Sequence, residues 1–280
     1  MSHPATFRLA GVMGWPVMHS RSPRLHNSWM RRYGVSGYYA PLPVEPGRLE
    51  AALRALPALN FAGCNVTLPH KEDIVRIADH VDPAAKAIGA ANCVVVLEDG
   101  SLAAFNYDVF GFMEALRAQA PGWRAAQGPA VVLGAGGAAR AVVYGLIAEG
   151  APEVRVVNRT LERAQAFASE FGPAVTPTKW TDRSEALAGA ALLVNTTSNG
   201  MVGQPPLDIS LDALPRNALV NDIVYTPLET PLLAAARARG NVAVDGLGML
   251  IQQARPAFRD WFGIMPDVTP EERAMMEGES

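Results

Sequence analysis

The chain has 280 residues, of which 49% are hydrophobic and 18% charged, and its net charge is −3. This length and apolar content allow two buried cores, and the balanced charge without a basic run argues against a nucleic-acid or membrane-surface partner. The N-terminus lacks the pattern of a signal peptide, and no apolar run is long enough to span a membrane. We therefore expect a cytoplasmic protein that binds neither nucleic acid nor membrane.

The first half of the chain alternates predicted strands and helices. Strands are expected at residues 8–13, 38–44 and 62–66. Helices are expected before Gly34, at 47–56, and from Pro69 to about His80, since proline is tolerated in a first turn. Two closely spaced strands, 92–97 and 102–105, and a helix from residue 109 complete this half. The pair Pro121-Gly122 ends that helix and marks our domain boundary, so that residues 1–120 form the first domain.

The second half continues the same alternation from the strand at 130–133. The helix 138–149 and the strands 153–157 and 191–194 follow, and another strand ends around 222–225. The last helix opens at residue 245, and the polar tail 266–280 is expected to be loosely ordered. This alternation predicts an α/β fold with mostly parallel sheets, in which ligands bind beyond the carboxyl ends of the strands.

Two serines lie in the loop after the first predicted strand. Ser20 and Ser22 stand before Pro23, which favours an extended loop, and two hydroxyls there can bind a carboxylate. A helix-capping serine and a turn serine explain the same residues equally well.

Asn65, Thr67 and Lys71 follow one another at the end of the strand 62–66. Asn65 and Thr67 alternate and so face the same side, and Lys71 falls in the first turn of the predicted helix. A helix N-terminus disfavours a cation, and such a lysine suits a group that gives and takes a proton. The alternative is a surface lysine paired with Glu72 or Asp73.

Further polar residues stand at the ends of the next two strands. Asn92 begins one, and Asn106 and Asp108 come directly after the other. A carboxylate close to Lys71 would hold the ammonium in place and exchange protons with it. Asp108 alternatively caps the helix that begins at residue 109.

A glycine fingerprint joins the strand 130–133 to the helix 138–149. Gly134 permits a tight turn, Gly136 lets the backbone approach a pyrophosphate, and Ala139 keeps the helix close to the strand. The phosphates would then lie at the helix N-terminus, where free N–H groups favour anions. A glycine turn in another kind of α/β protein remains the alternative.

The residues after the strand 153–157 distinguish between dinucleotides. An NAD site usually has an acidic residue about 20 positions beyond the fingerprint. This chain has Asn158 and Arg159 there, with Arg163 one turn further on. A guanidinium pairs with a 2′-phosphate, so the pattern predicts NADP as the cofactor. The alternative is that both arginines are solvated charges at the end of a helix.

Three polar segments of the second half also follow strands. Asn195 begins one at the carboxyl end of the strand 191–194, and Tyr225 ends the next. Asp245 opens the last helix, with Gln253 further along it, and the glycines beside Asp245 allow close backbone approach to a ligand. Each segment alone is explained by a loop or a cap.

Taken in chain order, these segments resemble the shikimate dehydrogenase family, from about Leu9 to Ala257. Seven motifs occur in one order, which makes the signal far more specific than any single motif. They are Ser20 to Pro23, Asn65 to Thr67 with Pro69 and Lys71, Gly134 to Gly137 with Arg140, Asn158 to Thr160, Asn195 to Thr197 with Gly200 and Met201, Tyr225 with Thr230 and Pro231, and Asp245 to Leu250 with Gln253.

The resemblance implies a substrate domain at 1–120, a Rossmann NADP domain at 121–244, and helices at 245–280 that return to the substrate domain. It also implies the reversible reduction of 3-dehydroshikimate to shikimate in aromatic amino-acid biosynthesis, with Lys71 and Asp108 as the catalytic pair. The implied substrate ligands are Ser20, Ser22, Asn65, Thr67, Asn92, Tyr225 and Gln253. The implied cofactor ligands are Gly134, Ala135, Gly136, Gly137, Ala138, Asn158, Arg159, Thr160, Arg163, Ile223 and Gly246.

Three residues depart from the family pattern. The family usually has a threonine at Tyr107, a glycine at Val109 and a threonine at Cys93. An added ring, a β-branched side chain and a lost hydroxyl would each reshape a substrate pocket. An alternative is therefore a relative that acts on quinate, an aminated shikimate or another cyclic hydroxy acid, although Arg159 argues against an NAD-preferring quinate enzyme.

The sequence also allows a function other than catalysis. In that alternative, the chain is a regulatory module that binds NADP without being an enzyme. The family resemblance allows both a monomer and a homodimer. Cys64 and Cys93 permit at most one disulfide and show no metal-ligand spacing, so we expect two small buried side chains and no metal.

Overall fold

The computed structural model describes residues 7–278. The chain forms two compact units: unit 1 holds the residues up to Tyr107 and those from Ile251 onward, and unit 2 runs from Asp108 to Leu250. Helix α5 (Asp108–Gln119) thus belongs to unit 2, whereas the predicted boundary lay after it. The reason is its buried side, where Phe112 and Leu116 share a core with residues of α6 (Gly137–Ala148).

Unit 1 is built on a six-stranded sheet with the order β2-β1-β3-β5-β6-β4. β1, β2 and β3 run parallel, and β5 and β6 form the predicted pair of antiparallel strands. The strands are β1 (Arg8–Gly14), β2 (Gly37–Pro43), β3 (Phe61–Val66), β4 (His80–Val81), β5 (Cys93–Val96) and β6 (Leu102–Phe105).

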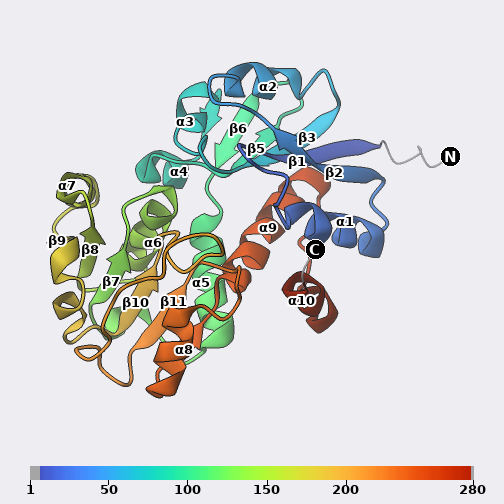
Figure 1. Ribbon diagram of the computed structural model, residues 1–280. Coiled ribbons are helices and arrows are strands. Elements are labelled where there is room, and N and C mark those ends of the chain that lie inside the picture. Colours follow the sequence, from blue (N-terminus) through green and yellow to red (C-terminus); the bar gives the residue numbers. More distant parts are fainter. Residues whose placement is uncertain (1–6, 279–280) are drawn as a thin grey trace. The chain divides into compact units, whose positions relative to one another are not determined.

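Helices cover both faces of this sheet (Figure 1). One face buries alternate residues such as Met13, Cys64 and Val66 beneath α2 (Leu49–Ala55), α3 (Ile74–Ile77) and α4 (Pro83–Ile88). The other face carries α1 (Ser22–Tyr33) and the end of α9 (Gly246–Phe262).

Gly63 of β3 makes the approach of α9 to this face possible. A Cβ atom at Gly63 would lie 2.3 Å from Nε1 of Trp261. That indole nitrogen donates a 3.0 Å hydrogen bond to the carbonyl of Val94 in the neighbouring strand. A side chain at residue 63 would therefore displace the tryptophan that fastens α9 to the sheet.

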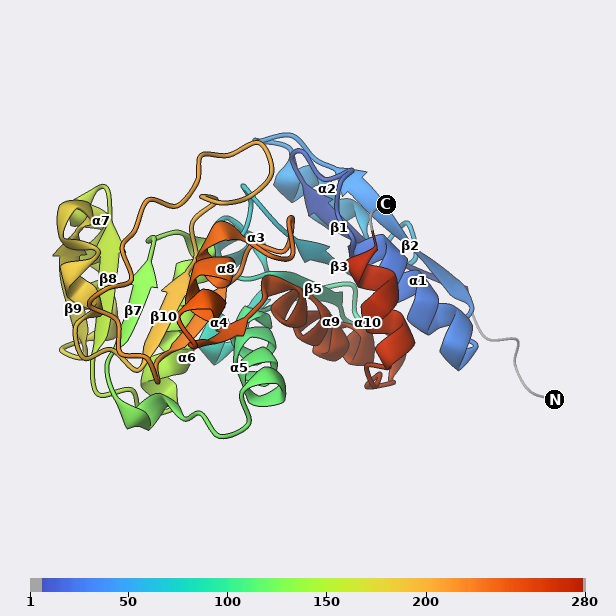
Figure 2. The same ribbon diagram turned by 60° about the horizontal axis from the view of Figure 1, so that its bottom comes forward.

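The expected looseness of the tail is wrong, because residues 270–277 form helix α10 (Pro270–Glu277) beside α1 (Figure 2). Thr269 and Glu272 make a reciprocal capping box at its start. Glu272 is buried and pairs with Arg32 of α1 at 3.2 Å, and Met276 is fully buried. These contacts supply the tertiary stabilisation that so short a helix requires.

Unit 2 is built on a parallel sheet with the order β12-β11-β10-β7-β8-β9. Read from β9, the strands follow the Rossmann order 3-2-1-4-5-6, whose switch point lies between β7 and β10. The strands are β7 (Ala130–Leu133), β8 (Val154–Asn158), β9 (Val175–Lys179), β10 (Leu192–Asn195), β11 (Leu219–Asp222) and β12 (Val242–Val244).

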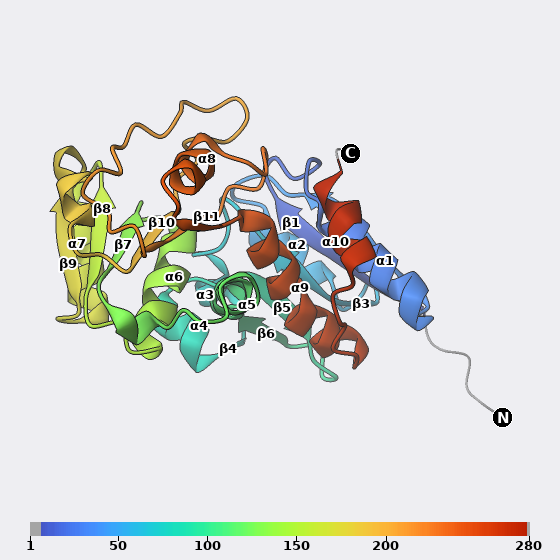
Figure 3. The same cartoon turned by 90° about the horizontal axis from the view of Figure 1, so that it is seen from below.

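Helices lie on both faces of this sheet (Figure 3), and each face buries its own core. Val132, Val156 and Val194 pack beneath α5, α6 and α7 (Leu161–Phe171). Val131 and Leu193 point to the other face, which α8 (Pro231–Ala238) covers. Three short 3-10 helices lie at Ala125–Gln127, Trp180–Asp182 and Glu185–Leu187. The predicted two-domain α/β fold is confirmed.

The predicted helix from Pro69 to His80 is wrong. Successive turns occupy residues 68–73, and only the four residues of α3 are helical before β4 begins. The carbonyl of Lys71 accepts a 2.8 Å hydrogen bond from the backbone of Ala91 instead of from the next helical turn. A tertiary contact has thus replaced the local structure that the sequence favours.

Candidate active site

The turn after β7 lies at the switch point of the unit 2 sheet, where Gly134 adopts a φ of +105°. A Cβ atom there would lie 2.8 Å from Oγ1 of Thr196, the residue that follows β10. The Thr196 hydroxyl in turn donates a 2.6 Å hydrogen bond to the carbonyl of Leu133. Glycine is therefore required both by the left-handed backbone and by the neighbouring strand.

Gly136 lies beside open space. It precedes the first turn of α6, and a Cβ atom on it would meet no heavy atom within 4 Å in the described part of the chain. Ala139 is fully buried, which keeps α6 against the sheet. The backbone N–H groups at the start of α6 therefore lie beside open space, as the binding of a pyrophosphate requires. The other residues predicted to bind here, Ala135, Gly137 and Ala138, are half-buried.

The end of β8 and the start of α7 carry the residues predicted to bind the adenosine phosphate. Asn158 donates a 2.9 Å hydrogen bond to the carbonyl of Thr160, which shapes the turn. Arg159 and Arg163 are exposed, and neither forms an ion pair with any residue in the range 7–278. Two unpaired guanidinium groups near a helix N-terminus fit a phosphate dianion.

A buried polar network follows β10 and β11. Nδ2 of Asn195 donates to Oδ1 of Asp222 at 3.0 Å, and the Thr230 hydroxyl donates to Oδ2 at 2.7 Å. Burial raises the pKa of Asp222 to about 6. The network holds together the two loops that follow these strands.

The two residues predicted at the nicotinamide end lie against one another. A Cβ atom on Gly246 would be 2.2 Å from the carbonyl oxygen of Ile223. The backbone N–H of Ile223 also donates to the carbonyl of Asn195 at 3.1 Å. Tyr225, a predicted substrate ligand of the same unit, is half-buried and follows β11 by three residues, so the predicted end of this strand is corrected to Asp222.

In unit 1, the two predicted serines lie at the start of α1. The backbone N–H of Ser22 donates to Oγ of Ser20 at 3.3 Å. Ser22 is buried. The Tyr39 hydroxyl donates to Oδ1 of Asn65 at 2.7 Å. Sequence reasoning missed Tyr39, which the fold places against a predicted substrate ligand.

Asn92 has a defined amide orientation. The backbone N–H of Tyr107, which can only donate, bonds to Oδ1 of Asn92 at 2.8 Å. Nδ2 of Asn92 then donates to Oε1 of Gln253 at 3.1 Å. Both side chains are buried, so the two amides form a hydrogen-bonded chain of fixed direction.

Lys71 and Thr67 lie in the segment after β3. Thr67 donates its N–H to the carbonyl of Met13, and the carbonyl of Lys71 accepts from Ala91, the residue before Asn92. Lys71 is half-buried and lies before α3. It is not in the first turn of a helix, so the expected effect of a helix N-terminus on its ammonium group does not apply. Asp108 is buried as the first residue of α5 in unit 2.

The three residues that depart from the family pattern are packed within the protein. The phenol of Tyr107 forms a hydrogen bond with the carboxylate of Asp260. A methyl group of Val109 packs against Gly145 of α6, where an added Cβ atom would lie 3.1 Å from it. Cys93 is fully buried, and its free thiol has a pKa raised by burial.

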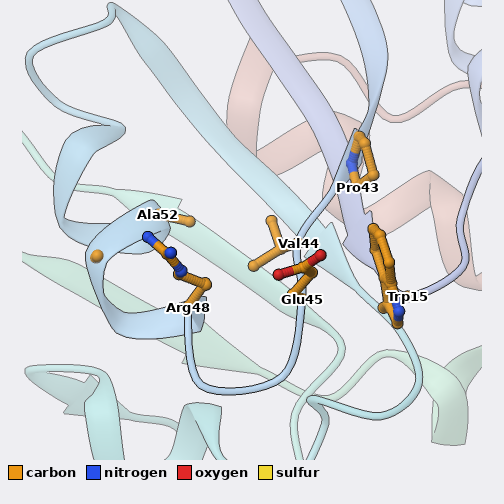
Figure 4. Close-up of a pocket in the computed structure, with 7 residues that line it drawn as sticks. Trp15, Pro43, Val44, Glu45, Arg48 and Ala52 are labelled. Carbon is orange, nitrogen blue, oxygen red and sulfur yellow. The ribbon is translucent and has the colours of Figure 1, made fainter.

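A hollow of about 400 Å³ opens beside the end of β2 in unit 1. Figure 4 shows Trp15 and Pro43 on one side of it and Arg48 with Ala52 on the other. The residues that line it, Trp15, Pro43, Val44, Glu45, Arg48, Ala51 and Ala52, include none of the predicted site residues. We therefore do not assign the substrate to this hollow.

Within the range 7–278, no group of three or more histidine, cysteine or acidic side chains is arranged to hold a metal ion. No helix of that range has the length and apolar character needed to cross a membrane.

Three family models match the chain. They describe the shikimate dehydrogenase substrate binding domain over residues 12–94, shikimate / quinate 5-dehydrogenase over residues 117–202, and the shikimate 5′-dehydrogenase C-terminal domain over residues 246–276. The first and the third of these models cover the regions that contain the polar residues of unit 1 and of α9. The second covers the glycine turn and the two free arginines.

Curated relatives and solved structures agree with these models. The chain is 56% identical to a shikimate dehydrogenase (NADP(+)) of Paramagnetospirillum magneticum, covering 96% of this chain and 98% of the relative. A structure of shikimate 5-dehydrogenase from Thermus thermophilus in complex with NADP(H) and shikimate matches with a TM-score of 0.85 and 39% identity, covering 96% and 97% of the two chains. Quinate dehydrogenase from Corynebacterium glutamicum in complex with NAD matches with a TM-score of 0.89 and 32% identity, covering 96% and 99%. The chain therefore belongs to the shikimate dehydrogenase family.

Proposed function

We propose that this protein catalyses the NADP-dependent, reversible reduction of 3-dehydroshikimate to shikimate. The observation that carries the proposal is the fixed orientation of the amides in unit 1, where Asn92 donates to Gln253. This orientation gives the buried amides one fixed pattern of donors and acceptors. Such a pattern suits a small acid whose ring carries several hydroxyl groups, and the relatives named above support this choice over other cyclic hydroxy acids.

Unit 2 would hold the cofactor. The N–H groups at the start of α6 would bind the pyrophosphate beside Gly136, and Arg159 with Arg163 would pair with the 2′-phosphate. Asn158 and Thr160 would shape that site, and the backbone around Ile223 and Gly246 would meet the nicotinamide end. When bound, NADPH supplies the hydride that reduces the substrate carbonyl.

Lys71 would supply the proton. Its ammonium would donate to the carbonyl oxygen as the hydride reaches the carbon, so that the two together convert a ketone into an alcohol. In the reverse direction the lysine would accept that proton. Asp108 would orient the ammonium and hold a ring hydroxyl, the roles that the family motif implies for this pair.

The remaining predicted ligands would bind the substrate. Two serine hydroxyls suit its carboxylate, and amide and hydroxyl groups suit its ring hydroxyls. The proposed set is Ser20 and Ser22 for the carboxylate and Asn65, Thr67, Asn92, Tyr225 and Gln253 for the ring. The cytoplasmic location stays a prediction from the sequence, and so does the choice between monomer and homodimer.

The test is to follow NADPH absorbance with purified protein, offering shikimate and quinate in parallel, each with NADP and with NAD. Turnover that is fastest with shikimate and NADP supports the proposal. Fast turnover of quinate with little turnover of shikimate would assign the chain to another substrate within the family. Tight NADP binding without turnover of either acid would favour the regulatory alternative.

A further inference from the structure

Tyr39 of β2 is fully buried and is held through its backbone and its ring. The Asn27 side chain of α1 bonds to both its N–H and its carbonyl at 2.9 Å. The His26 ring stacks on the phenol ring at 4.2 Å between centroids and 2° between planes. The hydroxyl of Tyr39 is therefore fixed in position before any ligand binds.

This hydroxyl contacts a proposed substrate ligand. It donates to Oδ1 of Asn65 at 2.7 Å. Nδ2 of Asn65 donates one hydrogen to the carbonyl of Asn92 at 3.2 Å. A carbonyl can only accept, so the amide of Asn65 has one allowed orientation, with its second Nδ2 hydrogen left to donate.

We propose that Tyr39 is a positioning residue, whose hydroxyl holds the Asn65 amide, together with the Asn92 carbonyl, in the orientation that binds the cyclic hydroxy acid. The inference rests on the proposed function, because Asn65 matters here only if it contacts that acid. Tyr39 acts through Asn65, and its ring belongs to the aromatic core with His26 and Trp261.

A purely structural role does not explain the hydroxyl. A phenylalanine would fill the same space and keep the stacking on His26, without placing a polar group in a buried site. Burial raises the pKa of Tyr39, so the phenol stays neutral and keeps the hydrogen that it donates to Asn65. The partner of this buried hydroxyl, Asn65, is a predicted ligand and belongs to another element, β3.

The experiment compares Tyr39→Phe with Tyr38→Phe. Tyr38 lies next to Tyr39 on the same strand and is 53% exposed, which makes it a matched control. We expect Tyr39→Phe to raise KM for shikimate about tenfold, the effect of one lost hydrogen bond to an oriented donor, with KM for NADP unchanged. Tyr38→Phe should behave as the unaltered protein.

Combining Tyr39→Phe with Asn65→Ala tests how the hydroxyl acts. If Tyr39 works through Asn65, the double variant should have the same KM for shikimate as Asn65→Ala alone. The inference would be overturned if KM in the double variant rose by the product of the two single effects. It would also be overturned by an unchanged KM in Tyr39→Phe, or by equal rises of KM for shikimate and for NADP in that variant. If the unaltered protein fails to oxidise shikimate, the proposed function fails first, so the two failures are distinguishable.

Discussion

The phenol of Tyr107 forms a hydrogen bond with the carboxylate of Asp260 in α9. The ring of Phe105 stacks on it at 5.7 Å, with 8° between the ring planes. The backbone N–H of Tyr107 fixes the amide of Asn92 at the same time. The aromatic residue that departs from the family pattern therefore braces a proposed substrate ligand from within unit 1.

This arrangement predicts the result of restoring the family residues. Tyr107→Thr combined with Val109→Gly should bring no gain in kcat/KM for shikimate, because both side chains pack against protein groups. Loss of the ring and of its bond to Asp260 should lower the free energy of unfolding by about 2 kcal/mol. Kinetics and urea unfolding of the double variant give both values. A gain in kcat/KM would instead show that these residues restrict the substrate pocket.

The glycine turn after β7 could be predicted because its causes are local. A buried strand, two glycines at fixed spacing and an apolar helix are contiguous in the sequence, and the observed φ of Gly134 follows from them. The helix α10 was missed although its signal was present, since Thr269 and Glu272 have the spacing of a capping box.

Tyr39 and the turns around Lys71 could not be predicted in the same way. Tyr39 looks like an ordinary strand residue, and its function depends on α1 and β3, which the fold brings to it. The segment around Lys71 has helical propensity, but the bond from Ala91 to its carbonyl decides its structure. Both depend on contacts between residues far apart in the chain.

Lys71 should be essential for turnover and unimportant for cofactor binding. Removing its proton-donating group by Lys71→Ala should lower kcat about 10² to 10⁴-fold, the usual contribution of general acid catalysis. NADP affinity, measured by fluorescence titration, should change little because the proposed cofactor residues lie in unit 2. Lys86→Ala, which removes an exposed lysine of α4, is the control for the lost charge. Turnover that survives Lys71→Ala would exclude this lysine as the proton donor.

Arg159 should determine the preference for NADP over NAD. A charge-assisted bond from its free guanidinium to a 2′-phosphate predicts that Arg159→Ala raises KM for NADP about 10- to 100-fold. KM for NAD, which lacks that phosphate, should stay the same. Arg216→Ala, a change before the amino end of β11, controls for the altered net charge. Equal changes for both cofactors would refute the assignment of Arg159 to the 2′-phosphate.

His26 should make unit 1 sensitive to acid. Its ring is fully buried, both ring nitrogens lack a partner among the described residues, and desolvation lowers its pKa from 6.5 to about 3. The unfolded chain therefore binds a proton more readily than the folded chain between these two values. The folding free energy that depends on neutral His26 is fully present above pH 6.5 and is lost as the pH falls toward 3, by about 1.4 kcal/mol per pH unit.

The variant His26→Phe tests this dependence, because a phenylalanine keeps a ring against Tyr39 and cannot titrate. Urea unfolding of both proteins at several values between pH 8 and pH 5 isolates the contribution of this one residue. The variant should lose about 2 kcal/mol less stability than the unaltered protein over that range. If the free energy of unfolding of the two proteins fell equally with pH, protonation of His26 would not destabilise unit 1. The buried ring would then not account for any sensitivity to acid.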